Sequence, residues 1–137
     1  MNSVPEKAPL PGWIPFIVLP GALLLAAGAI IALLRPAMLS GGEINGAVHI
    51  YAGYLAARNL ALAVLLLFTL SLRARRALST LMVLVAMIQL LDAAMDVLEG
   101  RWPLMPGVLV FAALFFFGAA RILGSPLWKA ASWRDVG

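Results

Sequence analysis

The sequence has 137 residues, of which 64% are hydrophobic and only 12% are charged, and its mean hydropathy is +1.01. About half the residues of a soluble domain are apolar and about a quarter are charged, so these values exclude an ordinary soluble protein and indicate an integral membrane protein. The absence of cysteine excludes disulfides and thiolate chemistry. The net charge of +4 fits loops that face anionic lipid better than a nucleic-acid-binding surface. The expected partner is therefore the lipid bilayer, with no nucleic acid.

Four long apolar runs follow one another along the chain, and each predicts a transmembrane helix. A hydrocarbon core of about 30 Å needs about 20 residues of helix to cross it. The predicted helices cover about residues 13–34, 47–72, 78–98 and 104–123. Residues 124–137 combine tryptophans with basic side chains, which predicts a tail at the membrane interface. The expected fold is all-α, with residues 1–137 forming a single membrane domain, a four-transmembrane-helix bundle.

The distribution of Lys and Arg predicts how this bundle is oriented. Four spans place both termini on the same side as the loop between the second and third helices. That side collects Lys7, Arg73, Arg75, Arg76, Arg121, Lys129 and Arg134, whereas the other side has only Arg35 and Arg101. Cytoplasmic loops keep the excess of basic residues, so both termini should be cytoplasmic. We expect a bacterial inner-membrane protein.

Charged and polar side chains interrupt the second and third helices, where they are energetically costly and rarely without a role. If these helices are antiparallel around a turn near Arg75, residues whose numbers sum to about 150 lie at the same depth. The level pairs are Arg58 with Asp92, Tyr54 with Asp96 and Tyr51 with Glu99, and a different crossing angle or helix rotation would pair Arg58 with Asp96 instead. Residues 51, 54 and 58 share a helical face, as do 89, 92, 96 and 99, so two polar stripes face each other. Asn59 is turned by about 100° from Arg58, toward the first or fourth helix.

The two stripes allow a structural and a functional interpretation. An Arg58–Asp92 pair neutralises itself and fixes the packing of two helices. This structural interpretation does not account for Asp96, Glu99 and Gln89, which lie on the same stripe as Asp92. Three carboxyl groups for one deeply placed base predict that at least one is poorly compensated and exchanges a proton. This favours a functional pocket, in the extracytoplasmic half of the membrane.

Metal and cofactor sites have weaker signals. His49 with Glu43, Asp96 and Glu99 would form an outward-facing metal site, but the chain has one histidine and no helical pair of histidine ligands. The sequence also lacks a Walker loop, a dinucleotide fingerprint, a haem motif and a serine nucleophile elbow. We therefore expect no metal and no cofactor.

Small residues form stripes on two of the predicted helices. Gly53, Ala57 and Ala61 follow one another on the second helix, and Gly28 and Ala32 on the first. Such small-xxx-small patterns let helices approach closely. We expect both stripes to pack within the monomer, and the alternative is a homodimer.

A family resemblance rests on three segments between residues 51 and 122. They are Ala57-Arg58-Asn59-Leu60-Ala61-Leu62, the basic turn from Arg73 to Arg76, and Gln89-Leu90-Leu91-Asp92. This pattern resembles small four-helix bacterial and fungal membrane proteins of the broad DoxX-like group, especially its uncharacterised branches, over about half of the chain. The resemblance implies a four-helix bundle with a polar centre, and it implies no reaction. Arg58 and Asp92 match the pattern, whereas Asp96 and Glu99 are not part of it.

The site chemistry leads to an acid–base enzyme as the first hypothesis. It would be an isomerase, a cyclase or an epoxide-opening hydrolase that acts on a lipophilic molecule entering from the bilayer. Asp92 would be the base or its partner, Arg58 the orienting cation and Asp96 the proton donor. Substrate would be bound by Tyr51, Tyr54, Asn59, Gln89 and Glu99, with the two tyrosines as hydrogen-bond donors to substrate oxygen.

Two other functions remain open. One is a small proton-coupled transporter or lipophile-binding membrane protein, and the other is an accessory membrane subunit whose polar network is purely structural. A transporter needs access from both faces, yet the polar residues in the cytoplasmic halves of the second and third helices are Thr69, Ser71, Ser79 and Thr80, all near the loop. This favours a pocket over a pathway. An accessory subunit would need neither carboxyl group.

Overall fold

The computed structural model describes residues 9–134, and all regular structure among them is helical. Four helices are long and apolar enough to cross a membrane: α1 (Ile14–Leu34), α3 (Gly46–Ser71), α4 (Arg75–Leu98) and α5 (Met105–Leu123). The short helix α2 (Ala37–Ser40) lies between α1 and α3, and the 3-10 turns η1 (Trp102–Leu104) and η2 (Ala130–Ser132) flank α5. The predicted all-helical architecture is confirmed, and α4 begins three residues earlier than the hydropathy predicts.

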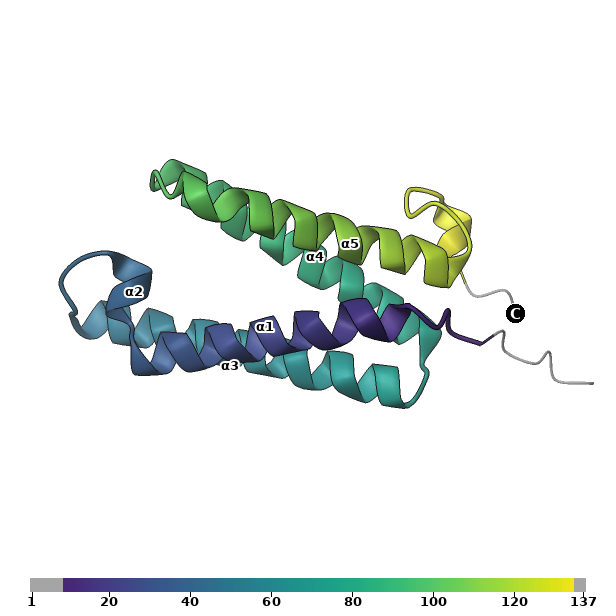
Figure 1. Cartoon of the computed structure of the whole chain (residues 1–137), viewed down its shortest axis with the longest axis horizontal. Coiled ribbons are helices and arrows are strands. Elements are labelled where there is room, and N and C mark those ends of the chain that lie inside the picture. Colours follow the sequence, from purple (N-terminus) through teal and green to yellow (C-terminus); the bar gives the residue numbers. More distant parts are fainter. Residues whose placement is uncertain (1–8, 135–137) are drawn as a thin grey trace, which may run out of the picture.

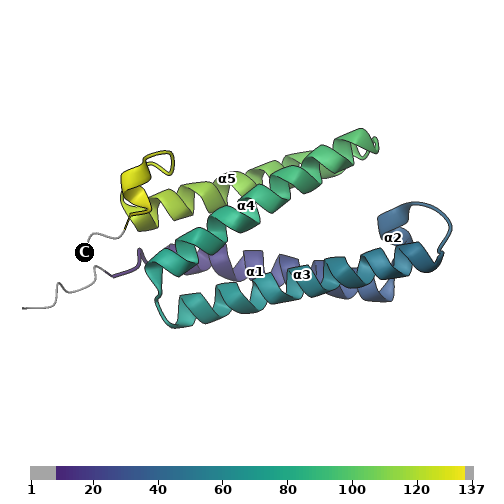
Figure 2. The same cartoon turned by 180° about the vertical axis from the view of Figure 1, so that it is seen from behind.

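The four long helices form two antiparallel pairs (Figure 1). Helix α1 lies along α3 and helix α4 along α5, and residues 72–74 join the pairs. The pairs meet near this turn and separate toward the end that carries α2 and η1, as Figure 2 also shows. We call the end with the turn the convergent end and the other the divergent end.

The apolar core shared by the four helices lies at the convergent end. Val18, Leu66, Met82 and Phe115, one from each long helix, are fully buried there. The buried members of this core reach no farther toward the divergent end than Leu25, Leu62, Ala86 and Ala112. A second, smaller core holds only α1 to α3, through Ala29, Ala32, Ala52 and Ala56. The facing surfaces of α3 and α4 at the divergent end are thus not joined by buried apolar side chains of the described chain.

The small-residue stripe on α3 differs from the prediction by one position. Ala52 and Ala56 face α1 and are buried, whereas Ala57 and Ala61 are exposed, and a Cβ on Gly53 would meet nothing within 4 Å. Adjacent residues are turned by about 100° on a helix, and both series are small, so the pattern alone selected the wrong face. On α1 the prediction holds, because Ala32 is buried against α3.

Both ends of the described chain lie at the convergent end. The Arg75 guanidinium donates from Nη1 to the carbonyl oxygen of Pro9 at 3.5 Å and from Nη2 to that of Ile122 at 2.6 Å. Arg76 Nη2 donates to the carbonyl oxygen of Arg134 at 3.3 Å. A chain with an even number of membrane-spanning helices has both of its ends on the same side. Lys7, which the orientation argument also uses, lies outside the described residues.

The C-terminal tail folds back on the convergent end after α5. Leu127 packs against the core, and the indole Nε1 of Trp133 donates to the carbonyl oxygen of Leu127 at 2.7 Å. The tail is therefore anchored to the bundle by an apolar contact and a hydrogen bond.

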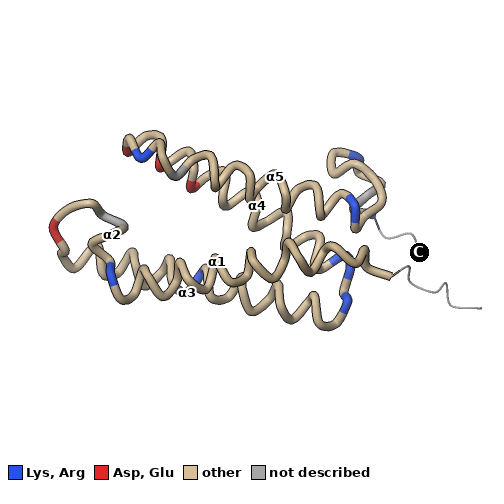
Figure 3. Tube along the Cα trace, viewed as in Figure 1, with Lys and Arg blue, Asp and Glu red and all other residues tan. Residues whose placement is uncertain are grey.

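Charge is distributed unevenly between the two ends (Figure 3). In the part of the chain that the structure describes, the acidic residues Glu43, Asp92, Asp96 and Glu99 all lie toward the divergent end. Among the described residues, the charged side chains of the turn and the tail at the convergent end are all basic. The carboxylates of the described chain therefore gather toward the divergent end.

Arg73 makes the turn between the pairs strained. Its φ is 50°, in the left-handed region that costs a residue with a side chain roughly 1–2 kcal/mol. We expect Arg73→Gly to raise the free energy of unfolding by roughly 0.5–1 kcal/mol, measured by SDS titration in mixed micelles. Arg73→Ala removes the same charge and keeps the Cβ, so it should give no gain. Equal stabilisation by both variants would mean that charge, and not backbone strain, is responsible.

Candidate functional site

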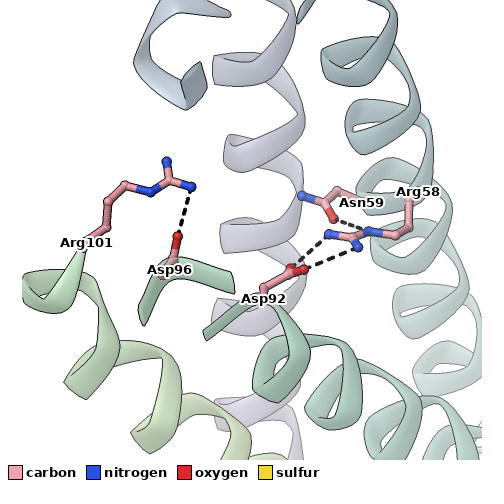
Figure 4. Close-up of polar contacts among 5 residues, drawn as sticks. All are labelled: Arg58, Asn59, Asp92, Asp96 and Arg101. Atoms are coloured by element: carbon pink, nitrogen blue, oxygen red, sulfur yellow. Dashed lines mark hydrogen bonds and ion pairs between the residues drawn. The ribbon is translucent and has the colours of Figure 1, made fainter. Parts of the chain in front are cut away.

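The centre of the site is an ion pair that joins the two helix pairs (Figure 4). Arg58 Nη2 lies 2.9 Å from Asp92 Oδ2, and Nη1 lies 3.5 Å from Oδ1. The guanidinium fork thus faces both oxygens of the carboxylate, which is the strong geometry for this pair. The structure confirms that residues 58 and 92 lie at one depth on facing helices.

Asn59 connects this pair to α1. Its Oδ1 accepts a hydrogen bond from Arg58 Nε at 3.4 Å. Its amide also packs on α1, since a Cβ on Gly28 would lie 3.2 Å from Asn59 Nδ2. Asn59 therefore turns toward the first helix, one of the two directions that the helical spacing predicts, and Gly28 leaves room for it.

A second charged group follows at the end of α4, where the backbone turns Arg101 back over the helix. Gly100 adopts a φ of 75°. Its N–H donates to the carbonyl oxygen of Val97 at 3.0 Å, and the N–H of Arg101 donates to the backbone carbonyl oxygen of Asp96 at 2.7 Å. This pair of hydrogen bonds is a Schellman motif, which favours glycine at its left-handed position. The side chain of Arg101 then binds Asp96 Oδ1 at 3.1 Å and also the Glu99 carboxylate.

A cavity of about 730 Å³ opens beside this group at the divergent end. We call it the outer cavity. It is lined by Met38, Gly41, Asn45, Ala47, Val48, Tyr51, Glu99 and Arg101. Tyr51 and Glu99, which the sequence places at one depth, thus line the same space from opposite helix pairs. Asn45 is held there because its Oδ1 caps α3 by accepting from the N–H of Val48 at 3.0 Å.

Two predicted site residues stay outside these contacts. Tyr54 is 74% exposed, and among the described residues the side chains of Tyr54 and Gln89 make no hydrogen bond. Tyr54 is turned by about 60° from Tyr51 around α3 and lies at the edge of the stripe. The structure therefore brings Arg58, Asn59 and Asp92 together in one group and Asp96 and Glu99 with Arg101 in a second, with Tyr51 on the cavity wall, and it leaves Tyr54 and Gln89 apart.

Each of the three carboxylates on α4 has an arginine partner. Asp92 pairs with Arg58, whereas Asp96 and Glu99 share Arg101. The side chain of Asp96 is 16% exposed, the most enclosed of the three. The group of two arginines and three carboxylates has a formal charge of −1, so the excess of acid that the sequence indicates is reduced but present.

The residues of the site that the sequence analysis did not count among the site residues come from the ends of helices. Arg101 enters the site because Gly100 reverses the chain, and the Glu99-Gly100 pair at a helix end was the available signal. Asn45 and Val48 enter through the cap of α3, and an Asn before an apolar run is again a readable signal. His49 is exposed, and among residues 9–134 no three His, Asp or Glu side chains gather as metal ligands.

Comparisons of the chain with protein-family models, with curated proteins and with solved structures give no match. The site geometry is therefore the basis on which a function is argued.

Proposed function

We propose that this membrane protein binds a lipophilic small molecule between the divergent halves of its two helix pairs and acts on it by acid–base chemistry. The observation that carries the proposal is the Arg58–Asp92 ion pair. Arg58 lies twelve residues after Gly46 and thirteen before Ser71, so it is in the middle of α3. A charge at that depth of a membrane helix is a functional-site hypothesis by default.

The surroundings of the pair favour a ligand over a purely structural network. The shared apolar core ends before this level, and the side chains of Arg58 and Asp92 are 36% and 40% exposed. Polar atoms that face hydrocarbon without a partner are costly, so the pair calls for water or the polar group of a bound molecule. A lipophilic molecule with one polar group satisfies both the apolar walls and the ion pair.

The contacts suggest how the residues divide the chemistry. Arg58 holds the Asp92 carboxylate in one orientation, which suits a general base. Asp96 is the proton donor in this proposal, and Arg101 contacts both its carboxylate and that of Glu99. Tyr51 donates a hydrogen bond to a substrate oxygen from the wall of the outer cavity. An isomerisation, a cyclisation or the opening of an epoxide needs such a pair of proton acceptor and donor.

The packing of the convergent end favours a pocket over a transport pathway. Leu66, Met82 and Phe115 are fully buried there. In the proposed orientation both termini are cytoplasmic and the outer cavity is extracytoplasmic, in a bacterial inner membrane. The resemblance to the DoxX-like group is part of the same proposal.

Native mass spectrometry of the protein extracted gently from its own host tests this function. We expect a retained lipophilic molecule in the wild-type protein and its loss, or its chemical alteration, in folded Asp92→Asn and Arg58→Ala variants. Glu43→Gln and Arg35→Gln are the matched controls, because they make comparable charge changes at exposed positions and should retain the molecule. If nothing is retained and the two site variants only unfold at lower temperature, the polar network is a packing device.

A further inference from the structure

The outer cavity contains recognition groups beyond those needed for acid–base chemistry. Met38, Ala47 and Val48 make part of its wall apolar. Tyr51 and Glu99 face the same space from the two helix pairs, and the Tyr51 side chain is 63% exposed. The cavity is thus amphipathic, with an aromatic ring and a carboxylate on opposite walls.

The charge at this cavity is negative. One arginine, Arg101, serves two carboxylates, those of Asp96 and Glu99, which leaves a formal charge of −1 for the three groups. A negative field raises the local concentration of cations and repels carboxylate and phosphate groups. An aromatic face together with a carboxylate is also the arrangement that binds ammonium groups.

Two turns of each helix separate the cavity from the ion pair. Tyr51 and Arg58 are seven residues apart on α3, and Asp92 and Glu99 are seven residues apart on α4, so both helices place the two polar levels about 10 Å apart. Leu55 and Met95 lie between these levels on the same helical faces, and Asp96, which binds Arg101, lies beside Met95. An apolar chain that starts at the cavity therefore has Leu55 and Met95 as hydrocarbon contacts on the way to the level of Arg58 and Asp92.

We propose that the molecule bound here is a lipophilic amine. Its ammonium group lies between the Tyr51 ring and the Glu99 carboxylate, and its apolar chain runs along α3 and α4 and carries a second polar group, the one of the proposed function, to the Arg58–Asp92 pair. This inference rests on the proposed function and names the substrate class of the same site.

The test measures binding of isotope-labelled decylamine, decanol and decanoate to the protein in phosphatidylcholine nanodiscs. Empty nanodiscs give the amount that partitions into lipid, which is subtracted. We expect decylamine to bind about tenfold more tightly than decanol, because the charge-assisted contact is worth about 1.5 kcal/mol. Decanoate should not bind above the empty-nanodisc level.

Three variants locate the ammonium group. Glu99→Gln should weaken decylamine binding about tenfold and leave decanol unchanged, and Tyr51→Leu should weaken decylamine binding about fivefold. Glu99 is the C-cap of α4, where a negative charge opposes the helix dipole, so its neutralisation should leave the fold intact. Glu43→Gln makes the same charge change outside the cavity wall and should leave both affinities unchanged.

The outcomes separate this inference from the proposed function. Equal affinities for decylamine and decanol that are insensitive to Glu99→Gln, but are lost in Asp92→Asn, would overturn the amine assignment and keep the ligand site. Preferred binding of decanoate would also overturn the amine assignment. If none of the three compounds binds above empty nanodiscs, both proposals fail.

Discussion

Arg58→Leu is expected to lower the free energy of unfolding by about 2–4 kcal/mol, because it leaves the Asp92 carboxylate without its cation between the two helix pairs. Asp92→Leu should cost a similar amount. The double variant Arg58→Leu/Asp92→Leu removes both charges and should return to within about 1 kcal/mol of the wild-type stability. SDS titration in mixed micelles measures the four members of this cycle.

The same cycle distinguishes packing from function. In the proposed site the double variant is folded and retains no lipophilic molecule, because the polar group of the ligand has lost its partners. Retention of the ligand by a folded double variant would assign the pair to helix packing alone. A double variant as unstable as the sum of the two single ones would show that the side chains do not act as a pair.

Gly21→Leu is the second change with a large expected effect. A Cβ on Gly21 would already lie 2.7 Å from Cε2 of Phe115 and 3.0 Å from Cζ of Phe111, in the core that holds the two helix pairs together. We expect a loss of about 3 kcal/mol or more in the free energy of unfolding, from overpacking. The loss is measured by the same titration.

A matched control for this prediction is Gly53→Leu. A Cβ at Gly53 meets nothing within 4 Å, so leucine there should gain roughly 0.5–1 kcal/mol from helix propensity. Gly21→Leu combined with Phe115→Ala should recover part of the loss, because the smaller side chain vacates the space. Equal effects of leucine at Gly21 and at Gly53 would contradict the packing of α1 on α5.

The fold was predictable because hydropathy and helix length are local properties of the chain. Depth was predictable as well, since a short turn makes residue counting reliable, and counting placed Arg58 opposite Asp92. Which face of α3 meets α1 was not predictable, because the series through Ala52 and through Gly53 both contain consecutive small residues. That choice depends on how all four helices pack together.

Counting residues along α3 and α4 did not predict how the carboxylates of the site are paired with arginines. The pairing of Arg101 with Asp96 depends on a chain reversal at Gly100, which lies outside the helical periodicity used to define the stripes. Tyr54 shows the complementary limit, because a tilt between helices decides whether a residue at the edge of a stripe reaches its neighbour.

The separation of the helix pairs means that a small rotation between them displaces the divergent end much more than the shared core. The pairs pack together from the turn as far as Ala86, and α4 extends about 18 Å beyond that residue. A rotation of about 10° of this part moves the far end of α4 by about 3 Å, while the residues of the shared core barely shift. The Arg58–Asp92 ion pair joins the two helix pairs in this part of the molecule and opposes their separation. A molecule whose polar group competes for either partner would weaken this restraint and widen its own route from the bilayer.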